Sequence, residues 1–354
     1  MRLPSLLSLL YATTALAALP YKGIDWSSLL IEEKAGKVYK NAAGQTQPLE
    51  TILKNTGVNT VRQRLWVNPS DGNYNLDYNI KLAKRAKAAG LQIYLDFHYS
   101  DNWADPGNQA TPAAWKGLAK DALVTKIYDY TKSVLDTFQT EGIPLSIVSI
   151  GNEITPGLLF PTGQLSASNG PANVAALLKS ASKAVKESRI RPTPKIMIHL
   201  DSGWNWETQK WWYNTVQAGG LSTSDYDIQG LSYYPFYNPS ATLAAISTSM
   251  ANLAKTFNKE VMIVETNWPS SCPNPKYAFP EDTKWVDISA YGQAQWIKEL
   301  GKRVAAVPGG KATGLFYWEP SWIENPGLGS SCDWNLMFAN DGTVMEGMAA
   351  YKTI

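Results

Sequence analysis

Two glutamates in this chain of 354 residues each end a short apolar segment and could act together as a pair of catalytic carboxylates. Glu153 ends the segment SIGNE (149–153), and Glu265 ends the segment VMIVE (261–265). Cleavage of a glycosidic bond needs such a pair, because one carboxyl group protonates the leaving oxygen while the other meets the developing oxocarbenium ion. The two residues therefore indicate acid–base and nucleophilic chemistry on a sugar.

The two carboxyl groups need different protonation states. Burial and the negative charge of Glu265 should raise the pKa of Glu153, which makes Glu153 the proton donor. Glu265 should stay ionised as the nucleophile, helped by one cation and one phenolic hydroxyl. Two arginines and two tyrosines near strand ends could supply them: Arg62, Arg64, Tyr233 and Tyr234.

Other polar and aromatic residues follow the remaining β-branched segments. In a (β/α)₈ barrel the binding groups lie at the C-terminal ends of the strands, so these residues are candidates for substrate contact. The predicted substrate-binding set is Asp25, Arg62, Arg64, Trp66, Asp96, His98, Trp103, Asn152, His199, Tyr233, Tyr234 and Trp318. Asn152 is expected to donate its amide to the sugar 2-hydroxyl.

Several members of this set have a second interpretation. His98 and His199 are the only histidines, and either could form hydrogen bonds within the wall of the site instead of touching substrate. The chain has 14 Trp and 18 Tyr, and any single one of them could be a core residue. Flat aromatic faces also suit sugar rings, and Trp66, Trp103, Trp115 and Trp318 are candidate platforms.

Eight short segments rich in β-branched and aromatic residues alternate with helical segments such as 76–89 and 125–139. The predicted strands are 22–25, 58–65, 91–97, 145–150, 195–200, 227–233, 260–264 and 313–317. This order predicts an α/β fold, a single-domain (β/α)₈ TIM barrel, with Glu153 after strand 4 and Glu265 after strand 7. A doubly wound open sheet is the alternative, but the first strand is followed by no Gly-rich phosphate loop.

The first 17 residues predict a secretory signal peptide. Met1 and Arg2 precede a leucine-rich stretch that ends in the small-x-small pattern Ala15-Leu16-Ala17. A membrane anchor is the alternative, but the stretch is too short and is interrupted by Ser and Thr. The catalytic domain should therefore span residues 18–354 of a secreted, extracellular protein.

Composition limits the partners of the chain. Its formal charge is +2, with acidic and basic residues mixed throughout, so neither nucleic acid nor a membrane surface is an expected partner. A polysaccharide is the expected substrate, and we expect a monomer. No cluster of His, Asp and Glu has the spacing of metal ligands, which disfavours metal catalysis.

The chain contains only two cysteines, Cys272 and Cys332, and both lie in stretches rich in Pro, Ser, Gly and Asn. In an exported protein they predict one disulfide between two loops, with two free thiols as the alternative. Closing a loop of about 60 residues would contribute about 4 kcal/mol in the chain-entropy model.

Longer motifs resemble a known family. The segments VRQRLWVNP (61–69), DFHYSDNWADPG (96–107) and GLSYYPF (230–236) accompany Gly-Asn-Glu before residue 154 and Glu-Thr-Asn-Trp from residue 265. Together they resemble glycoside hydrolase family 53, the endo-β-1,4-galactanases, and most closely its fungal members. The similarity extends over essentially the whole mature chain.

The resemblance implies endo-hydrolysis of the β-1,4-galactan side chains of pectic type I arabinogalactan, with retention of configuration. It assigns the acid/base role to Glu153 and the nucleophile role to Glu265. Bacterial members hold calcium in the loop after strand 7, where this chain carries Cys272, so a disulfide is expected to brace the loop and no cofactor is expected. The alternatives are another retaining barrel endo-glycanase, a β-mannanase or endoglucanase, and a non-catalytic polysaccharide-binding barrel.

Overall fold

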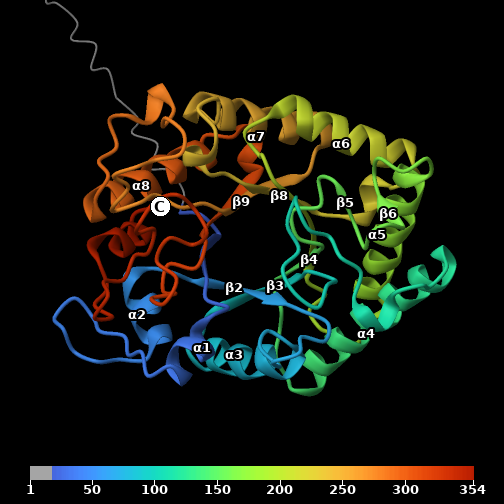
Figure 1. Cartoon of the computed structure of the whole chain (residues 1–354), viewed down its shortest axis with the longest axis horizontal. Helices are drawn as coiled ribbons and strands as arrows, with labels where there is room; N and C mark the ends of the chain where they lie inside the picture. The colour runs from blue at the N-terminus through green and yellow to red at the C-terminus, as the bar shows by residue number, and fades with distance from the viewer. Residues whose placement is uncertain (1–17) are drawn as a thin grey trace, which may run out of the picture.

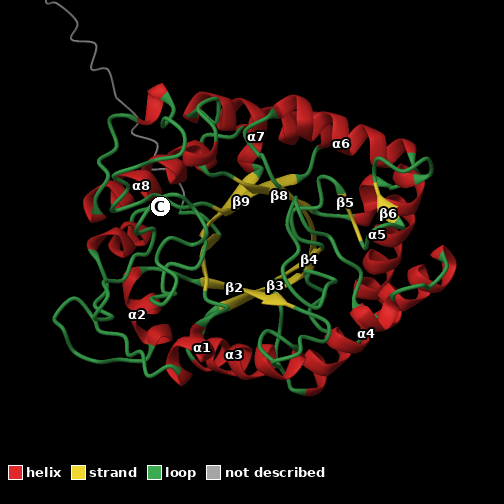
Figure 2. Cartoon of the chain, in the orientation of Figure 1, coloured by secondary structure: helices red, strands yellow, loops and turns green. Residues whose placement is uncertain are grey.

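Eight parallel strands close into a barrel, as Figures 1 and 2 show in a computed structural model that describes residues 18–354. Around the barrel the strand order is β1-β10-β9-β8-β7-β4-β3-β2. The strands are β1 (Tyr21–Asp25), β2 (Thr60–Leu65), β3 (Gln92–Phe97), β4 (Ile147–Ile150), β7 (Lys195–Leu200), β8 (Ile228–Ser232), β9 (Glu260–Glu265) and β10 (Ala312–Tyr317). The predicted (β/α)₈ barrel is confirmed. The predicted signal peptide lies outside the described residues.

Helices surround the barrel as an outer ring (Figure 2). They are α1 (Leu29–Lys34), α2 (Leu49–Thr56), α3 (Leu76–Ala88), α4 (Lys120–Thr140), α5 (Gly170–Glu187), α6 (Trp206–Ala218), α7 (Leu243–Phe257) and α8 (Ala290–Ala305). Side-chain caps begin several of them; Asn75, for example, accepts a hydrogen bond from the amide of Tyr78. Among residues 18–354, none of the helices combines the length and the apolar character that crossing a membrane requires.

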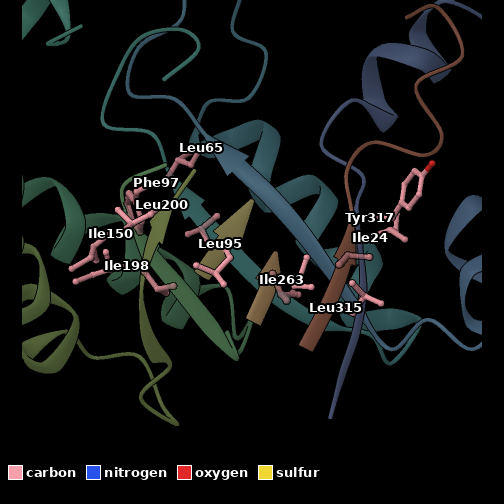
Figure 3. Close-up of a cluster of buried hydrophobic side chains, with 14 of the residues drawn as sticks. Ile24, Leu65, Leu95, Phe97, Ile150, Ile198, Leu200, Ile263, Leu315 and Tyr317 are labelled. Atoms are coloured by element: carbon pink, nitrogen blue, oxygen red, sulfur yellow. The ribbon is translucent and has the colours of Figure 1, made fainter. Parts of the chain in front are cut away.

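Strand alternation divides the apolar residues into two layers. One set, which includes Leu95, Ile198 and Ile263, belongs to the large core cluster in which the strands pack against the helices (Figure 3). The alternate positions fill the barrel interior with a separate cluster: Tyr94, Ile147, Met197, Ile228, Met262, Val264 and Phe316. The interior set closes the floor of the barrel, so any polar site must lie above it, at the C-terminal ends of the strands.

Two local irregularities bring the glutamates into the barrel mouth. β8 and β9 pair Leu231 with Ile263 and then Ser232 with Glu265, so Val264 is an extra residue in the ladder. Such a bulge changes the direction of the next side chain. After β4, Gly151 has a φ of 128° and Glu153 has a φ of 49°, a left-handed turn that follows the strand immediately.

A disulfide between Cys272 and Cys332 joins the loops that follow β9 and β10, as predicted. Beside it, the amide of Ser270 donates to the carbonyl of Trp334 at 2.8 Å. The bridge closes 60 residues of chain, and it braces a region whose Leu328 and Gly329 reach the wall of the central cavity.

Replacing Cys272 and Cys332 together by serine is expected to lower the free energy of unfolding by about 2–5 kcal/mol, because the unfolded chain gains the freedom of the opened loop. Urea denaturation of the parent chain and the variant measures this difference. Addition of a reductant should lower the midpoint of the parent and leave the variant unaffected. Equal midpoints for parent and variant would contradict the bracing role.

Candidate active site

A cavity of about 600 Å³ opens at the C-terminal ends of the strands, and Glu153 and Glu265 both line it. Six residues of the predicted substrate-binding set also line it: Arg62, His98, Trp103, Asn152, Tyr234 and Trp318. The cavity therefore collects residues that the sequence spreads over more than 250 positions. Residues 18–354 contain no cluster of three or more His, Cys, Asp or Glu side chains arranged to hold a metal ion.

Glu265 is held by one cation and one hydroxyl. Arg62 Nη2 lies 2.8 Å from Glu265 Oε1, and the Tyr234 hydroxyl donates to Oε2 at 2.7 Å. Burial raises the pKa of Glu265 above its ordinary value, and the Arg62 guanidinium and the Tyr234 hydroxyl oppose that rise. These two contacts favour the ionised carboxylate, which lines the cavity.

Arg62 is shared among several acceptors. Its Nη1 donates to Asp25 and its Nη2 to Asp96, both at 2.7 Å, and Nη2 also lies 2.7 Å from the Asn152 side-chain oxygen. The arginine is 1% exposed, so these contacts form out of reach of water. A guanidinium fixed by three partners holds Glu265 in one orientation.

Asp96, which contacts Arg62, also forms a pair with His98. Burial raises the pKa of Asp96, but Arg62 and a hydrogen bond from His98 outweigh it and bring the pKa to about 2. His98 Nε2 lies 3.2 Å from Asp96, and its Nδ1 accepts from the Trp66 indole and the Ala104 amide, each at 3.1 Å. Burial lowers the pKa of His98, so the ring is neutral and donates through Nε2.

Glu153 is buried as well, but its environment raises its pKa further than that of Glu265. Burial, the charge of Glu265 and the charge of Asp201 raise the pKa of Glu153 well above its ordinary value. The strained turn that presents it is held by Gln109, whose side-chain nitrogen donates to the Asn152 carbonyl at 2.8 Å. Because the pKa of Glu153 is raised further than that of Glu265, Glu153 is the group that holds the proton while Glu265 is ionised, which is the pairing that glycoside cleavage requires.

Replacing Tyr234 by phenylalanine is expected to lower kcat about 10- to 100-fold, which corresponds to the loss of one hydrogen bond to a charged group. Because the hydroxyl lowers the pKa of Glu265, its removal raises that pKa and moves the acidic limb of the pH–kcat/KM profile to higher pH. Hydrolysis rates across the acidic range measure both effects. Tyr233→Phe is the matched control, since the Tyr233 hydroxyl donates to the Ala241 carbonyl instead; an equal shift in both variants would contradict this role.

The structure places the other six predicted substrate contacts behind the cavity wall. They are Asp25, Arg64, Trp66, Asp96, His199 and Tyr233, each 8% exposed or less. Each is engaged by protein atoms; His199 Nε2, for example, lies 2.9 Å from the Ser232 hydroxyl. Trp115, proposed as a platform, is buried in a short 3₁₀ helix (Ala113–Trp115) and contacts Tyr130.

Some residues that line the cavity are outside the predicted substrate-binding set: Asp201, Trp204, Tyr237, Asn267 and Trp322. Asp201 directly follows β7, so its strand-end position was a usable signal. The others come two to five residues after the end of a strand, where spacing in the sequence does not indicate the direction of a side chain. Trp322 stacks on Trp103 with ring centroids 6.2 Å apart and an interplanar angle of 23°.

Comparisons with known proteins agree with this site. The sequence profile of Glycosyl hydrolase family 53 matches residues 21–351. The chain is similar to an arabinogalactan endo-beta-1,4-galactanase of Thermothelomyces thermophilus, with 55% identity over 338 residues, 95% of this chain and 100% of the relative. It is also similar to arabinogalactan endo-beta-1,4-galactanase A of Aspergillus niger, with 51% identity over 353 residues, 99% of each chain.

A solved structure supports the same assignment. One chain from a study of two fungal beta-1,4-galactanases superposes with a TM-score of 0.92 at 55% sequence identity, covering 95% of this chain and 100% of that one. The similarity therefore extends over nearly the whole of the chain. This chain belongs to glycosyl hydrolase family 53.

Proposed function

We propose that this protein is a retaining endo-β-1,4-galactanase that hydrolyses the galactan side chains of type I arabinogalactan. One observation carries the proposal: a Glu265 carboxylate held by Arg62 and Tyr234 shares a cavity with Glu153, whose pKa is raised well above the ordinary value. The fungal relatives described above are named for this activity.

Cleavage proceeds in two displacements. First, an oxygen of Glu265 bonds to the anomeric carbon while the glycosidic C–O bond breaks and Glu153 gives its proton to the leaving oxygen. Water then attacks the anomeric carbon of the galactosyl-enzyme, Glu153 takes a proton from that water, and the Glu265 carboxylate leaves. Two inversions at one carbon give net retention.

Asn152 has a positioning and binding part in this scheme. Its side-chain oxygen accepts from Arg62 and its side-chain nitrogen donates to the Ala104 carbonyl at 2.8 Å. The second amide hydrogen is available to the 2-hydroxyl of the sugar that bonds to Glu265. Such a hydrogen bond strengthens as positive charge develops on the ring.

The cavity wall suits a curved chain. The axial 4-hydroxyl of galactose bends a β-1,4-linked chain, so aromatic faces must meet successive rings at different angles. Trp103 and Trp318 line the cavity with an interplanar angle of 66°, and Trp103 and Trp322 with an angle of 23°. We further propose that residues 1–17 direct export and are removed, consistent with the disulfide of an oxidising compartment.

Reducing-sugar release from β-1,4-galactan, β-mannan and carboxymethylcellulose tests the substrate. Release from galactan is expected, with a fall in viscosity that precedes most of the reducing-end formation, as endo-cleavage requires. Proton NMR should show the β-anomer as the first product. Activity on mannan or carboxymethylcellulose with none on galactan would contradict the proposal and favour the β-mannanase or endoglucanase alternative.

A further inference from the structure

A second buried ion pair lies beside the catalytic carboxylates and takes no part in the reaction described above. Arg64 Nη1 lies 2.5 Å from Glu319 Oε1, and neither side chain is more than 1% exposed. Neither residue lines the cavity. The pair connects the end of β2 to the residue that comes two positions after β10.

Ser28 also holds Glu319, through the same carboxylate oxygen that contacts Arg64. The backbone amide of Ser28 donates to it at 3.0 Å and the Ser28 hydroxyl at 2.8 Å, while Arg64 Nη2 donates to the same hydroxyl at 2.9 Å. Glu319 also has a φ of 44°, a left-handed conformation that is uncommon for a residue with a side chain. Contacts on this scale hold a backbone conformation that would otherwise relax.

The backbone held in this way carries two tryptophans of the cavity. Trp318 directly precedes Glu319, and the amide of Trp322 donates to the Glu319 carbonyl at 3.3 Å. With Trp103 they form the group that we call the tryptophan wall: Trp103, Trp318 and Trp322 all line the cavity. Trp103 contacts Trp318 and Trp322 at ring-centroid distances of 6.1 and 6.2 Å.

Arg64 lies against this wall on the side away from the cavity. Its guanidinium carbon is 4.4 Å from the ring centroid of Trp103 and 5.3 Å from that of Trp322. The ring centroid of Tyr74 is 4.1 Å from the same carbon. The planar cation therefore contacts three aromatic rings, an arrangement that constrains ring orientation as well as charge.

A buried ion pair contributes little net stability compared with apolar residues of the same volume, whereas its geometry is specific. The pair acts on the tryptophan wall in two ways. Arg64 contacts the ring of Trp103, and Glu319 holds the backbone that links Trp318 to Trp322. We propose that Arg64 and Glu319 are positioning residues that set the angles of the tryptophan wall and thereby the affinity of the cleft for a galactan chain. This inference rests on the proposed function.

Binding of β-1,4-galactotetraose to the full chain tests the inference, with Glu265→Ala present throughout to prevent turnover. Arg64→Lys keeps the charge and removes the planar stack, and it is expected to raise the dissociation constant about fivefold to thirtyfold, the range that a desolvated cation–π contact represents. Glu319→Gln should raise it in the same direction. With Glu265 intact, KM for galactan should rise while kcat changes less than about threefold, because neither residue touches the reacting atoms.

Arg85→Lys is the matched control. Arg85 also pairs with two carboxylates, Glu33 and Glu50, each at 2.7 Å, but it lies on α3 and away from the cavity. Its replacement should leave the dissociation constant unchanged even if it lowers the melting temperature. An Arg64→Lys variant that loses melting temperature and keeps the parent dissociation constant would overturn the positioning role.

A double-mutant cycle with Trp103→Ala separates positioning from a general structural effect. If Arg64 acts through Trp103, the effect of Arg64→Lys should fall to within about twofold once the indole is absent. Equal effects in both backgrounds would overturn the inference. If Arg64→Lys does not fold, a cycle of Glu319→Gln with Trp322→Ala replaces this one, because Glu319 acts through the backbone that links Trp318 to Trp322. Failure of the parent to bind galactotetraose would contradict the proposed function, whereas binding that Arg64 and Glu319 do not affect contradicts the positioning role alone.

Discussion

Replacement of Glu265 by alanine is expected to reduce kcat on β-1,4-galactan by several orders of magnitude. The variant retains the cavity and the acid Glu153, but no atom remains to bond to the anomeric carbon. Loss of the carboxylate also leaves Arg62 with one fewer anionic partner, so the cation stays in the site without its charge complement. Initial rates of reducing-sugar release measure the loss.

Azide provides the sharper readout for this variant. A small anion can occupy the space of the missing carboxylate beside Arg62 and attack from the same face. With an activated aryl β-galactobioside, the expected product is the α-glycosyl azide, which has the inverted configuration. The α-azide identifies Glu265 as the nucleophile. Turnover of Glu265→Ala within tenfold of the parent, without azide, would refute the assignment. A parent chain that does not hydrolyse galactan at all would favour a polysaccharide-binding barrel.

Replacement of Glu153 by alanine is expected to give a different pattern that depends on the leaving group. On galactan, kcat should fall by several orders of magnitude because the leaving sugar hydroxyl needs a proton. On an aryl galactoside with a strongly acidic phenol, formation of the galactosyl-enzyme needs no proton, so this step should remain fast. Water attack then lacks its base, and a burst of phenol followed by a slow steady state is expected.

The product with azide distinguishes the two glutamates. In Glu153→Ala, azide attacks the intermediate on Glu265 and should give the β-glycosyl azide, the anomer opposite to that from Glu265→Ala. The pH profile gives a second check. Burial and the charges of Glu265 and Asp201 raise the pKa of Glu153, and the protonated form is the active one. Activity of the parent should therefore fall as pH rises through that raised pKa, and the alkaline limb should disappear in Glu153→Ala on the activated substrate. The same anomer from both variants would contradict the separate roles.

Much of the fold followed from local pattern. Each of the eight predicted segments overlaps a strand of the barrel, and the segment 195–200 coincides with β7. Parallel strands buried on both faces are short apolar runs, and helices between them supply clear boundaries, so the order of elements could be recognised without contacts. The cysteine pairing also followed, because a chain with two cysteines has only one internal pairing.

The choice between Arg62 and Arg64 could not be made in this way. Both belong to β2 and have the same parity, so both point into the barrel. Packing separates them: Arg62 reaches Glu265, whereas Arg64 is held by Glu319 under the ring of Trp103. Glu319 comes from the other end of the chain, and its contact with β2 exists only after the barrel closes.

The sequence by itself determined the element order, the two glutamates at strand ends and the chemistry that two carboxyl groups can perform. Tertiary structure alone decided their direction and their charge. Regular alternation would place Glu265 on the helix-facing side with Ile263, and a bulge at Val264 turns it into the cavity. The protonation of each glutamate depends on its burial and on partners that other strands bring within about 3 Å. The pKa of a carboxyl group is therefore set by these spatial contacts, which its neighbours along the chain do not determine.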